Sequence, residues 1–187
     1  MSATSSTLSP LAAEFTPAAV RAPKPAKIKI RYEIRDAPGK GLGMFATHPI
    51  KRGSLILAEA ALISIPDNEL PRAWSAYCNL SAGDKAKFDS LHYFIRPEYE
   101  QASRLYLVDT EQTEEMIDAQ VAEHIRVMST FGCNDFSISA SGQGVFFIAS
   151  RMNHSCVPNV HHSYNPTLEQ ELVYAIRDIY QGNQFFL

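Results

Sequence analysis

The chain has 187 residues, of which 45% are apolar and 20% charged, the balance of a globular protein with a buried core. The formal net charge is −3, so there is no basic surplus to neutralise phosphates, and we expect no direct binding to nucleic acid. No apolar run approaches the roughly 18 residues of a membrane span, and three widely separated cysteines form no disulfide framework, which favours a reducing, intracellular compartment.

The N-terminal third divides into a tail and a β-rich part. Residues 1–27 are rich in Ser, Ala and Pro, a composition typical of a disordered tail. Ile28–Ile34 alternates apolar and charged residues, the pattern of a half-buried strand. After a turn dense in Gly and Pro, Met44–Ala46 is expected to form a short strand. The apolar, β-branched run Ser54–Ile65 predicts one or two more.

The middle of the chain, residues 67–135, has helical character. Residues 68–77 and 83–91 predict short helices, and residues 114–130 predict a longer one with apolar side chains on one face. This apolar stripe indicates core packing, and we assign it no chemistry.

The ends of the long helix carry recognisable signals. Thr110 or Thr113 can cap its N-terminus, where Glu111, Glu114 and Glu115 favour the positive end of the helix dipole. Gly132 can end it.

The C-terminal part, residues 136–187, returns to β-structure. Residues 145–148 and 172–176 are expected to be strands, and a turn follows at 178–182. Short strands interrupted by helices predict an α+β domain over 28–187, with an N-terminal part at 28–66, a helical insertion at 67–135 and a C-terminal part at 136–187.

A glycine-rich loop, Gly39-Lys40-Gly41-Leu42-Gly43, follows the first predicted strand. Glycines at alternate positions let backbone approach a ligand closely. The spacing also fits a dinucleotide-binding fingerprint, but that motif needs a helix directly after it, and Pro49 and Gly53 exclude one. Taken alone, the loop is better explained as a hairpin turn.

A denser motif, Arg-x-Asn-His-Ser-Cys-x-Pro-Asn, occupies residues 151–159 after an apolar strand. So many hydrogen-bonding groups require partners. Three interpretations remain open on the residues alone: a zinc site built from His154, Cys156, His161 or His162, a Cys/His nucleophile pair, and a ligand-binding loop.

This motif resembles the signature of SET-domain methyltransferases. Lys40–Ala46, with Gly53 and Ile56 behind it, resembles the opening of the same domain, and Val173–Gly182 resembles the strand and turn near its end. The three segments occur in the family's order. The helical insertion makes the chain most similar to fungal SET proteins related to the SET-and-MYND group.

The resemblance implies a protein-lysine N-methyltransferase that uses S-adenosyl-L-methionine. The residues assigned to the methyl donor are Lys40, Gly41, Leu42, Gly43, Arg151, Asn153 and His154. Asn134 matches the family only weakly, and a surface-turn asparagine is the simpler interpretation. Phe146, Phe147 and Tyr164 are candidates for a lysine channel, although aromatic residues in strands usually belong to the core.

The chain departs from the family pattern after Gly182. The catalytic tyrosine is expected beyond Leu187, and Tyr180 lies too early to take its role. We therefore expect a C-terminally truncated domain, with a cofactor pocket that lacks its terminal element and with Cys156 as an orphaned zinc ligand. Three cysteines cannot build a MYND zinc module.

These departures keep two further functions open. The chain could be a non-catalytic interaction protein or inactive short isoform on a SET scaffold, or a small metal-binding protein. As an enzyme, it would act on lysine in a histone, ribosomal or other protein, in the nucleus or the cytoplasm. The sequence makes no prediction of oligomeric state.

Overall fold

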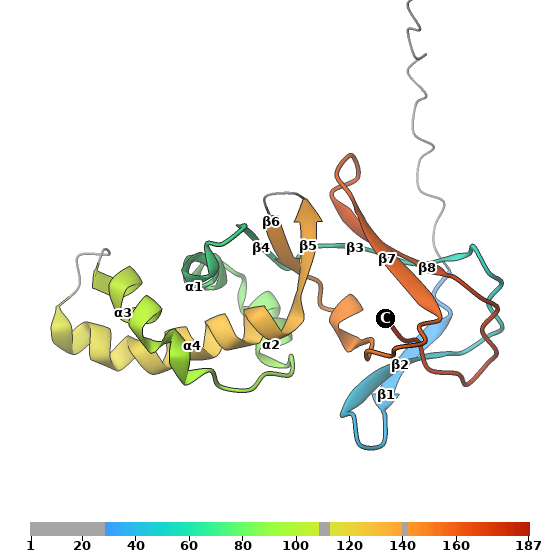
Figure 1. Cartoon of the computed structure of the whole chain (residues 1–187), viewed down its shortest axis with the longest axis horizontal. Coiled ribbons are helices and arrows are strands. Elements are labelled where there is room, and N and C mark those ends of the chain that lie inside the picture. Colours follow the sequence, from blue (N-terminus) through green and yellow to red (C-terminus); the bar gives the residue numbers. More distant parts are fainter. Residues whose placement is uncertain (1–28, 109–112, 140–141) are drawn as a thin grey trace, which may run out of the picture.

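The computed structural model describes residues 29–108, 113–139 and 142–187 of the chain. Within these residues, the helices gather at one end of an elongated molecule and most strands lie at the other (Figure 1). The α+β class predicted from the sequence is confirmed. The expected N-terminal tail and the alternative cap Thr110 lie outside the described residues.

The first sheet is a hairpin of β1 (Tyr32–Asp36) and β2 (Leu42–Ala46), which pair antiparallel. Its turn is closed by a hydrogen bond from the Ala37 amide to the Gly41 carbonyl at 2.7 Å. Gly39 and Gly41 have φ angles of 73° and 68°. Because side chains disfavour this left-handed region, glycine is needed at both positions.

The second sheet joins the two ends of the domain. Its strands are β3 (Leu55–Ala60), β7 (Val160–Asn165) and β8 (Gln170–Ala175), in the order β3-β8-β7. Pairing across more than 100 residues places the N-terminal part beside the C-terminal part, with β8 in the centre.

The third sheet lies between the other two sheets and the helices (Figure 1). It consists of β4 (Ile63–Pro66), β5 (Asp135–Ser139) and β6 (Gly142–Val145), in the order β4-β6-β5. The apolar run at 54–65 therefore forms two strands that belong to different sheets.

Helices and helical turns fill the segment between β4 and β5. In chain order they are η1 (Leu70–Arg72), α1 (Ala73–Cys78), α2 (Ala82–Asp89), η2 (Pro97–Tyr99), α3 (Glu100–Val108) and α4 (Glu114–Asn134). The α4 helix begins as predicted, because the Thr113 hydroxyl accepts a hydrogen bond from the Met116 amide. Its apolar face includes Ile117, Val121 and Ile125, all buried.

The prediction that Gly132 ends α4 is wrong, since the helix continues to Asn134. A Cβ atom at position 132 would lie 3.3 Å from the Tyr99 hydroxyl. The glycine therefore lets Tyr99 of η2 pack closely against α4. The Asn134 side chain closes the last turn by donating to the Thr130 carbonyl at 2.7 Å.

The predicted strand at 145–148 is also wrong beyond its first residue. Strand β6 ends at Val145, and the chain enters a 3₁₀ turn, η3 (Ala149–Arg151). The Ser150 amide donates to the Phe146 carbonyl, and the side chain of Glu59 accepts from the amides at 148 and 149. These bonds bend the backbone away from the sheet.

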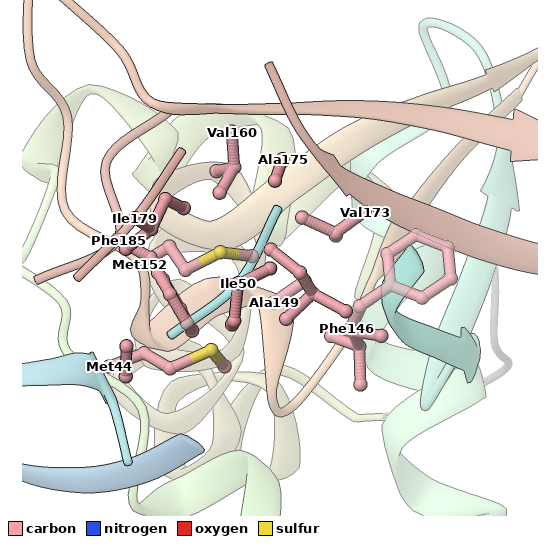
Figure 2. Packing of buried hydrophobic residues seen from close by; sticks show 13 residues of the cluster. Met44, Ile50, Phe146, Ala149, Met152, Val160, Val173, Ala175, Ile179 and Phe185 are labelled. Carbon is pink, nitrogen blue, oxygen red and sulfur yellow. The ribbon is translucent and has the colours of Figure 1, made fainter. Parts of the chain in front are cut away.

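The main core gathers buried side chains from several strands and includes Phe185 of the C-terminal segment (Figure 2). Met44, Phe146, Val173 and Phe185 are each 0% exposed, and they meet there from four different segments. A second cluster, which includes Phe88, Phe131 and Val145, ties the helices to the third sheet. Within the described residues, no helix combines the length and apolar character needed to cross a lipid bilayer.

Candidate functional site

A cavity of about 950 Å³ lies where the glycine turn, the end of α2, the end of α4 and the η3 turn meet. We call it the central cavity. The residues that line it are Gly39, Lys40, Gly41, Leu42, Ser90, Leu91, His92, Tyr93, Cys133, Asn134, Ser150, Arg151, Met152, Asn153 and His154. Its size suits a small organic ligand, since such pockets usually measure about 300–1,000 Å³.

A direct hydrogen bond joins the two sequence motifs in the wall of the central cavity. The side-chain amide of Asn153 donates to the carbonyl oxygen of Leu42 at 3.0 Å. Because the two residues are 111 positions apart, no local rule of sequence dictates this contact. The motif at 151–159 and the glycine turn therefore form one continuous wall.

Arg151 is a buried cation in this wall. Its side chain donates to the Ser90 carbonyl at 3.1 Å and to the Ser90 hydroxyl at 2.7 Å, and its guanidinium lies 4.9 Å from the ring centre of Phe147. Burial lowers the pKa of Arg151. Within the described part of the chain, Arg151 forms no ion pair, and two of its five donors are used by Ser90. An anionic group in the cavity could engage the others.

Asn134 is not the surface-turn residue that the simpler interpretation predicted. It is 9% exposed, and its side chain donates to the carbonyls of His92 and Thr130 at 2.8 and 2.7 Å. Its own carbonyl accepts from the Ser150 hydroxyl at 3.3 Å. Asn134 therefore connects α4 to two other walls of the cavity. Sequence reasoning missed Ser150, whose only signal was its place beside the motif.

Gly43 differs from the other residues assigned to the methyl donor because it does not line the cavity. A Cβ atom at this position would overlap the side-chain amide of Gln184 and lie 3.0 Å from the Cβ of Ala37. The glycine therefore makes room for the C-terminal segment. The structure brings the other six candidates together: Lys40, Gly41, Leu42, Arg151, Asn153 and His154.

The histidines and cysteines of the motif do not gather into a metal site. The Nε2 atom of His154 lies 3.9 Å from Sγ of Cys156, while the Nδ1 atom of His162 lies 3.0 Å from the buried carboxylate of Glu171. Within residues 29–108, 113–139 and 142–187, no group of three His, Cys, Asp or Glu side chains could hold a metal ion. The described residues from His154 to His162 therefore do not by themselves bring together three metal ligands.

The C-terminal segment reaches the Asn153 loop, while the absence of the tyrosine-bearing element expected beyond Leu187 stays a prediction. Asn153 and Phe186 form a parallel bridge, in which the Leu187 amide donates to the Asn153 carbonyl at 3.1 Å and the Ser155 amide donates to the Leu187 carbonyl at 2.8 Å. Asn159 donates to the Gln184 carbonyl and accepts from the Phe186 amide, both at 2.8 Å. The sequence did not predict these contacts, because Asn183–Leu187 lacks the acidic residues of the family pattern.

Aromatic side chains from β5, β7 and the segment after β6 form a cluster. Phe136 packs edge-on against Phe146 and His162, at ring-centre distances of 5.7 and 5.0 Å, and Tyr164 lies 6.3 Å from Phe146. Phe146 is completely buried and belongs to the core, whereas Phe136 and Tyr164 are partly exposed. Tyr180 is 72% exposed and does not line the cavity.

Comparison with known proteins agrees with the motifs. A family model described as SET domain matches residues 41–187. A curated relative, histone-lysine N-methyltransferase set5 of Schizosaccharomyces pombe, is 31% identical over 155 residues, which cover 82% of this chain and 40% of the relative. A solved structure titled "putative histone methyltransferase" from Plasmodium falciparum is 14% identical, with a TM-score of 0.45 over 85% of this chain and 92% of that one.

Proposed function

Because the chain belongs to the SET-domain family, we propose that its central cavity binds S-adenosyl-L-methionine and that the protein is a SET-class protein-lysine N-methyltransferase. The observation that carries this proposal is the bond from Asn153 to Leu42, which unites the two family motifs around one cavity. Since the chain spans 40% of the length of its curated relative, the activity of that longer protein is part of the proposal.

The residues of the cavity fit the chemistry of the methyl donor. S-adenosyl-L-methionine carries a carboxylate, an ammonium group, ribose hydroxyls and an adenine ring. Arg151 is a cation that lies in the wall without an acidic partner in the described residues, so it can hold the carboxylate. Backbone groups at 39–42 and the Asn153 side-chain oxygen can accept hydrogen bonds from the ammonium group and the hydroxyls.

The remaining wall can hold the adenine end. His154 presents an exposed ring at the rim. On the opposite side, Asn134 holds the backbone carbonyl of His92 and accepts from the Ser150 hydroxyl, so polar groups line that wall. When bound, the donor supplies a methyl group on a positively charged sulfur. The protein's task is then alignment, because direct displacement needs the attacking amine in line with that bond.

The attacking lysine must be neutral, and an apolar passage can provide this. Removing an amine from water lowers its pKa without a strong base. Phe136 and Tyr164, which lie partly exposed beside Phe146, are the candidates for this passage. We propose a protein substrate, and the relative's name favours a histone lysine over a ribosomal or other protein.

The donor proposal is tested by titration calorimetry on the purified chain and on two histidine variants. His154→Ala removes an exposed ring that lines the cavity, and His161→Ala removes an exposed ring that does not. We expect His154→Ala to weaken donor binding about tenfold, the effect of roughly one hydrogen bond or stacking contact, and His161→Ala to leave it unchanged. Absence of binding to the unmodified chain at millimolar donor would contradict the proposal.

Catalysis is tested separately with radiolabelled donor. Incorporation of label into core histones, and its loss in Asn153→Ala, is the expected result. Donor binding without transfer to histones, ribosomal proteins or a lysine-peptide panel would favour the non-catalytic scaffold instead.

A further inference from the structure

We propose that Glu59 is a positioning residue: by holding the start of the η3 turn, it fixes the backbone that forms one wall of the methyl-donor cavity. This inference rests on the proposed function, because it concerns the same cavity. Glu59 lies on β3 and does not line the central cavity. Any effect of this residue on donor binding must therefore pass through the residues that it holds.

The carboxylate of Glu59 grips the start of the η3 turn. Its Oε1 atom accepts from the Ile148 amide at 2.8 Å, and its Oε2 atom accepts from the Ile148 and Ala149 amides at 3.1 and 2.9 Å. The first amides of a helical turn have no partner within the turn, and a carboxylate can satisfy two of them at once. The contact spans about 90 positions of sequence, so it fixes the turn to the second sheet.

Backbone hydrogen bonds connect the residues held by Glu59 to the residues of the cavity wall. The Ile148 carbonyl accepts from the Arg151 amide at 3.0 Å, and the Ala149 carbonyl accepts from the Met152 amide at 3.0 Å. The two residues whose N–H groups donate to Glu59 thus accept, through their own carbonyls, from the amides of Arg151 and Met152, which line the cavity. Asn153 follows immediately and makes the bond to the glycine turn.

Glu59 is partly buried, and it lies beside a second cavity. Glu59 lines a separate cavity of about 450 Å³, together with Phe147, Ile148 and Lys87. Burial raises the pKa of Glu59, while the bonds from the amides at 148 and 149 act in the opposite direction. Because burial removes the charged carboxylate from water, which is unfavourable, its hydrogen bonds from the amides are needed to stabilise it. This explains why the turn is held so specifically.

The decisive variant is Glu59→Gln, which keeps the shape of the side chain but replaces one acceptor oxygen by a donor. At least one of the three bonds from the amides at 148 and 149 is then lost, the side chain no longer carries a negative charge, and its new NH₂ group faces an N–H donor. We expect donor affinity to fall about tenfold, as for loss of one hydrogen bond to a charged group. We also expect faster hydrogen exchange over residues 146–153, with exchange in α4 unchanged.

Two controls separate positioning from general destabilisation. Glu33→Gln makes the same substitution at an exposed site on β1, and it should change neither measurement. Val121→Ala removes buried volume from α4, far from η3 in the chain, and should lower overall stability while donor affinity is kept.

Each outcome decides the inference. Faster exchange at 146–153 together with weaker donor binding in Glu59→Gln supports it. Unchanged exchange in that segment overturns it, and so does faster exchange with unchanged donor affinity, or an equal loss of affinity in Val121→Ala. If the unmodified chain binds no donor, the proposed function fails, and both the donor-wall role and this inference fail with it, even where the exchange data still show Glu59 anchoring the turn.

Discussion

At the scale of single residues, Gly43 belongs to a motif assigned to the methyl donor yet serves protein packing. Its backbone lies against the side chain of Gln184, and Phe185 beside it is fully buried in the main core. A methyl group at position 43 has no space unless the C-terminal segment moves. The requirement for glycine here is therefore steric, and it differs from the conformational requirement at Gly39 and Gly41.

Gly43→Ala should destabilise the protein by about 1–3 kcal/mol, the usual cost of forcing extra volume into a packed site. Chemical denaturation monitored by circular dichroism measures this change. Gly83→Ala is the matched control, because Gly83 lies in α2, where an added Cβ atom would be 3.9 Å from its nearest neighbour, the Ser81 hydroxyl. There the same substitution should stabilise by about 0.5–1 kcal/mol, since alanine favours a helix. Equal effects at both positions would contradict the steric explanation.

The residues that line the central cavity could be predicted where residue type and spacing carry the chemistry. Asn153 and His154 stand out because a core has no use for such a density of polar groups. Asn134 could not be singled out in this way. A buried asparagine that closes a helix end has the same sequence pattern as an exposed one, and only the packing of His92 and Ser150 around it distinguishes the two.

At the scale of elements, the helical segment is held together by a buried polar contact. His124, on α4, is 0% exposed, and its Nδ1 atom lies 2.9 Å from the hydroxyl of Ser103 on α3. The rings of Trp74 and Tyr106 flank it at centre-to-centre distances of 5.4 and 5.3 Å. This burial lowers the pKa of His124 to about 4.

The lowered pKa of His124 predicts acid sensitivity. Above pH 6.5, the ordinary value, the imidazole is neutral in both the folded and unfolded chains, and its contribution to stability is fully present. As the pH falls from there through about 4, the unfolded chain takes up a proton first, so this contribution is lost. We expect His124 to account for a loss of about 1–3 kcal/mol across that window.

Denaturation series between pH 7 and pH 4.5 test this expectation. The free energy of unfolding should fall less steeply with acid in His124→Gln than in the unmodified chain, while His48→Gln, at an exposed site, keeps the original slope. A variant at position 124 that retains the full slope would place the acid sensitivity elsewhere.

Elements were predictable where local pattern and tertiary packing agree. The α4 helix and strand β8 follow from their apolar periodicity, and both are present. The predicted strand beyond Val145 failed because its apolar residues also suit a buried turn, and the choice depends on the distant carboxylate of Glu59. Hydrogen bonds between distant segments leave no mark on local periodicity.

At the scale of the whole molecule, residues of both the helical segment and the β-rich part line the central cavity. The glycine turn and η3 supply one side, whereas residues 90–93 and the end of α4 supply the other. Asn134 and Arg151 bridge the two sides, through Ser150 and Ser90 respectively. A ligand in this position contacts both parts at once, so its binding should couple their stabilities.

Donor binding should therefore stabilise both parts together. At a donor concentration of about 100 times the dissociation constant, linkage predicts a gain of about 2.7 kcal/mol in the free energy of unfolding. Hydrogen exchange should slow both at 39–42 and at 90–93. Asn134→Ala should weaken binding and remove the protection at 90–93, because the His92 carbonyl loses its partner. Asn79→Ala, at the exposed end of α1, should retain the full response. Protection confined to the glycine turn would show that the donor engages only the β-rich part, since a ligand that touches one wall cannot order the other.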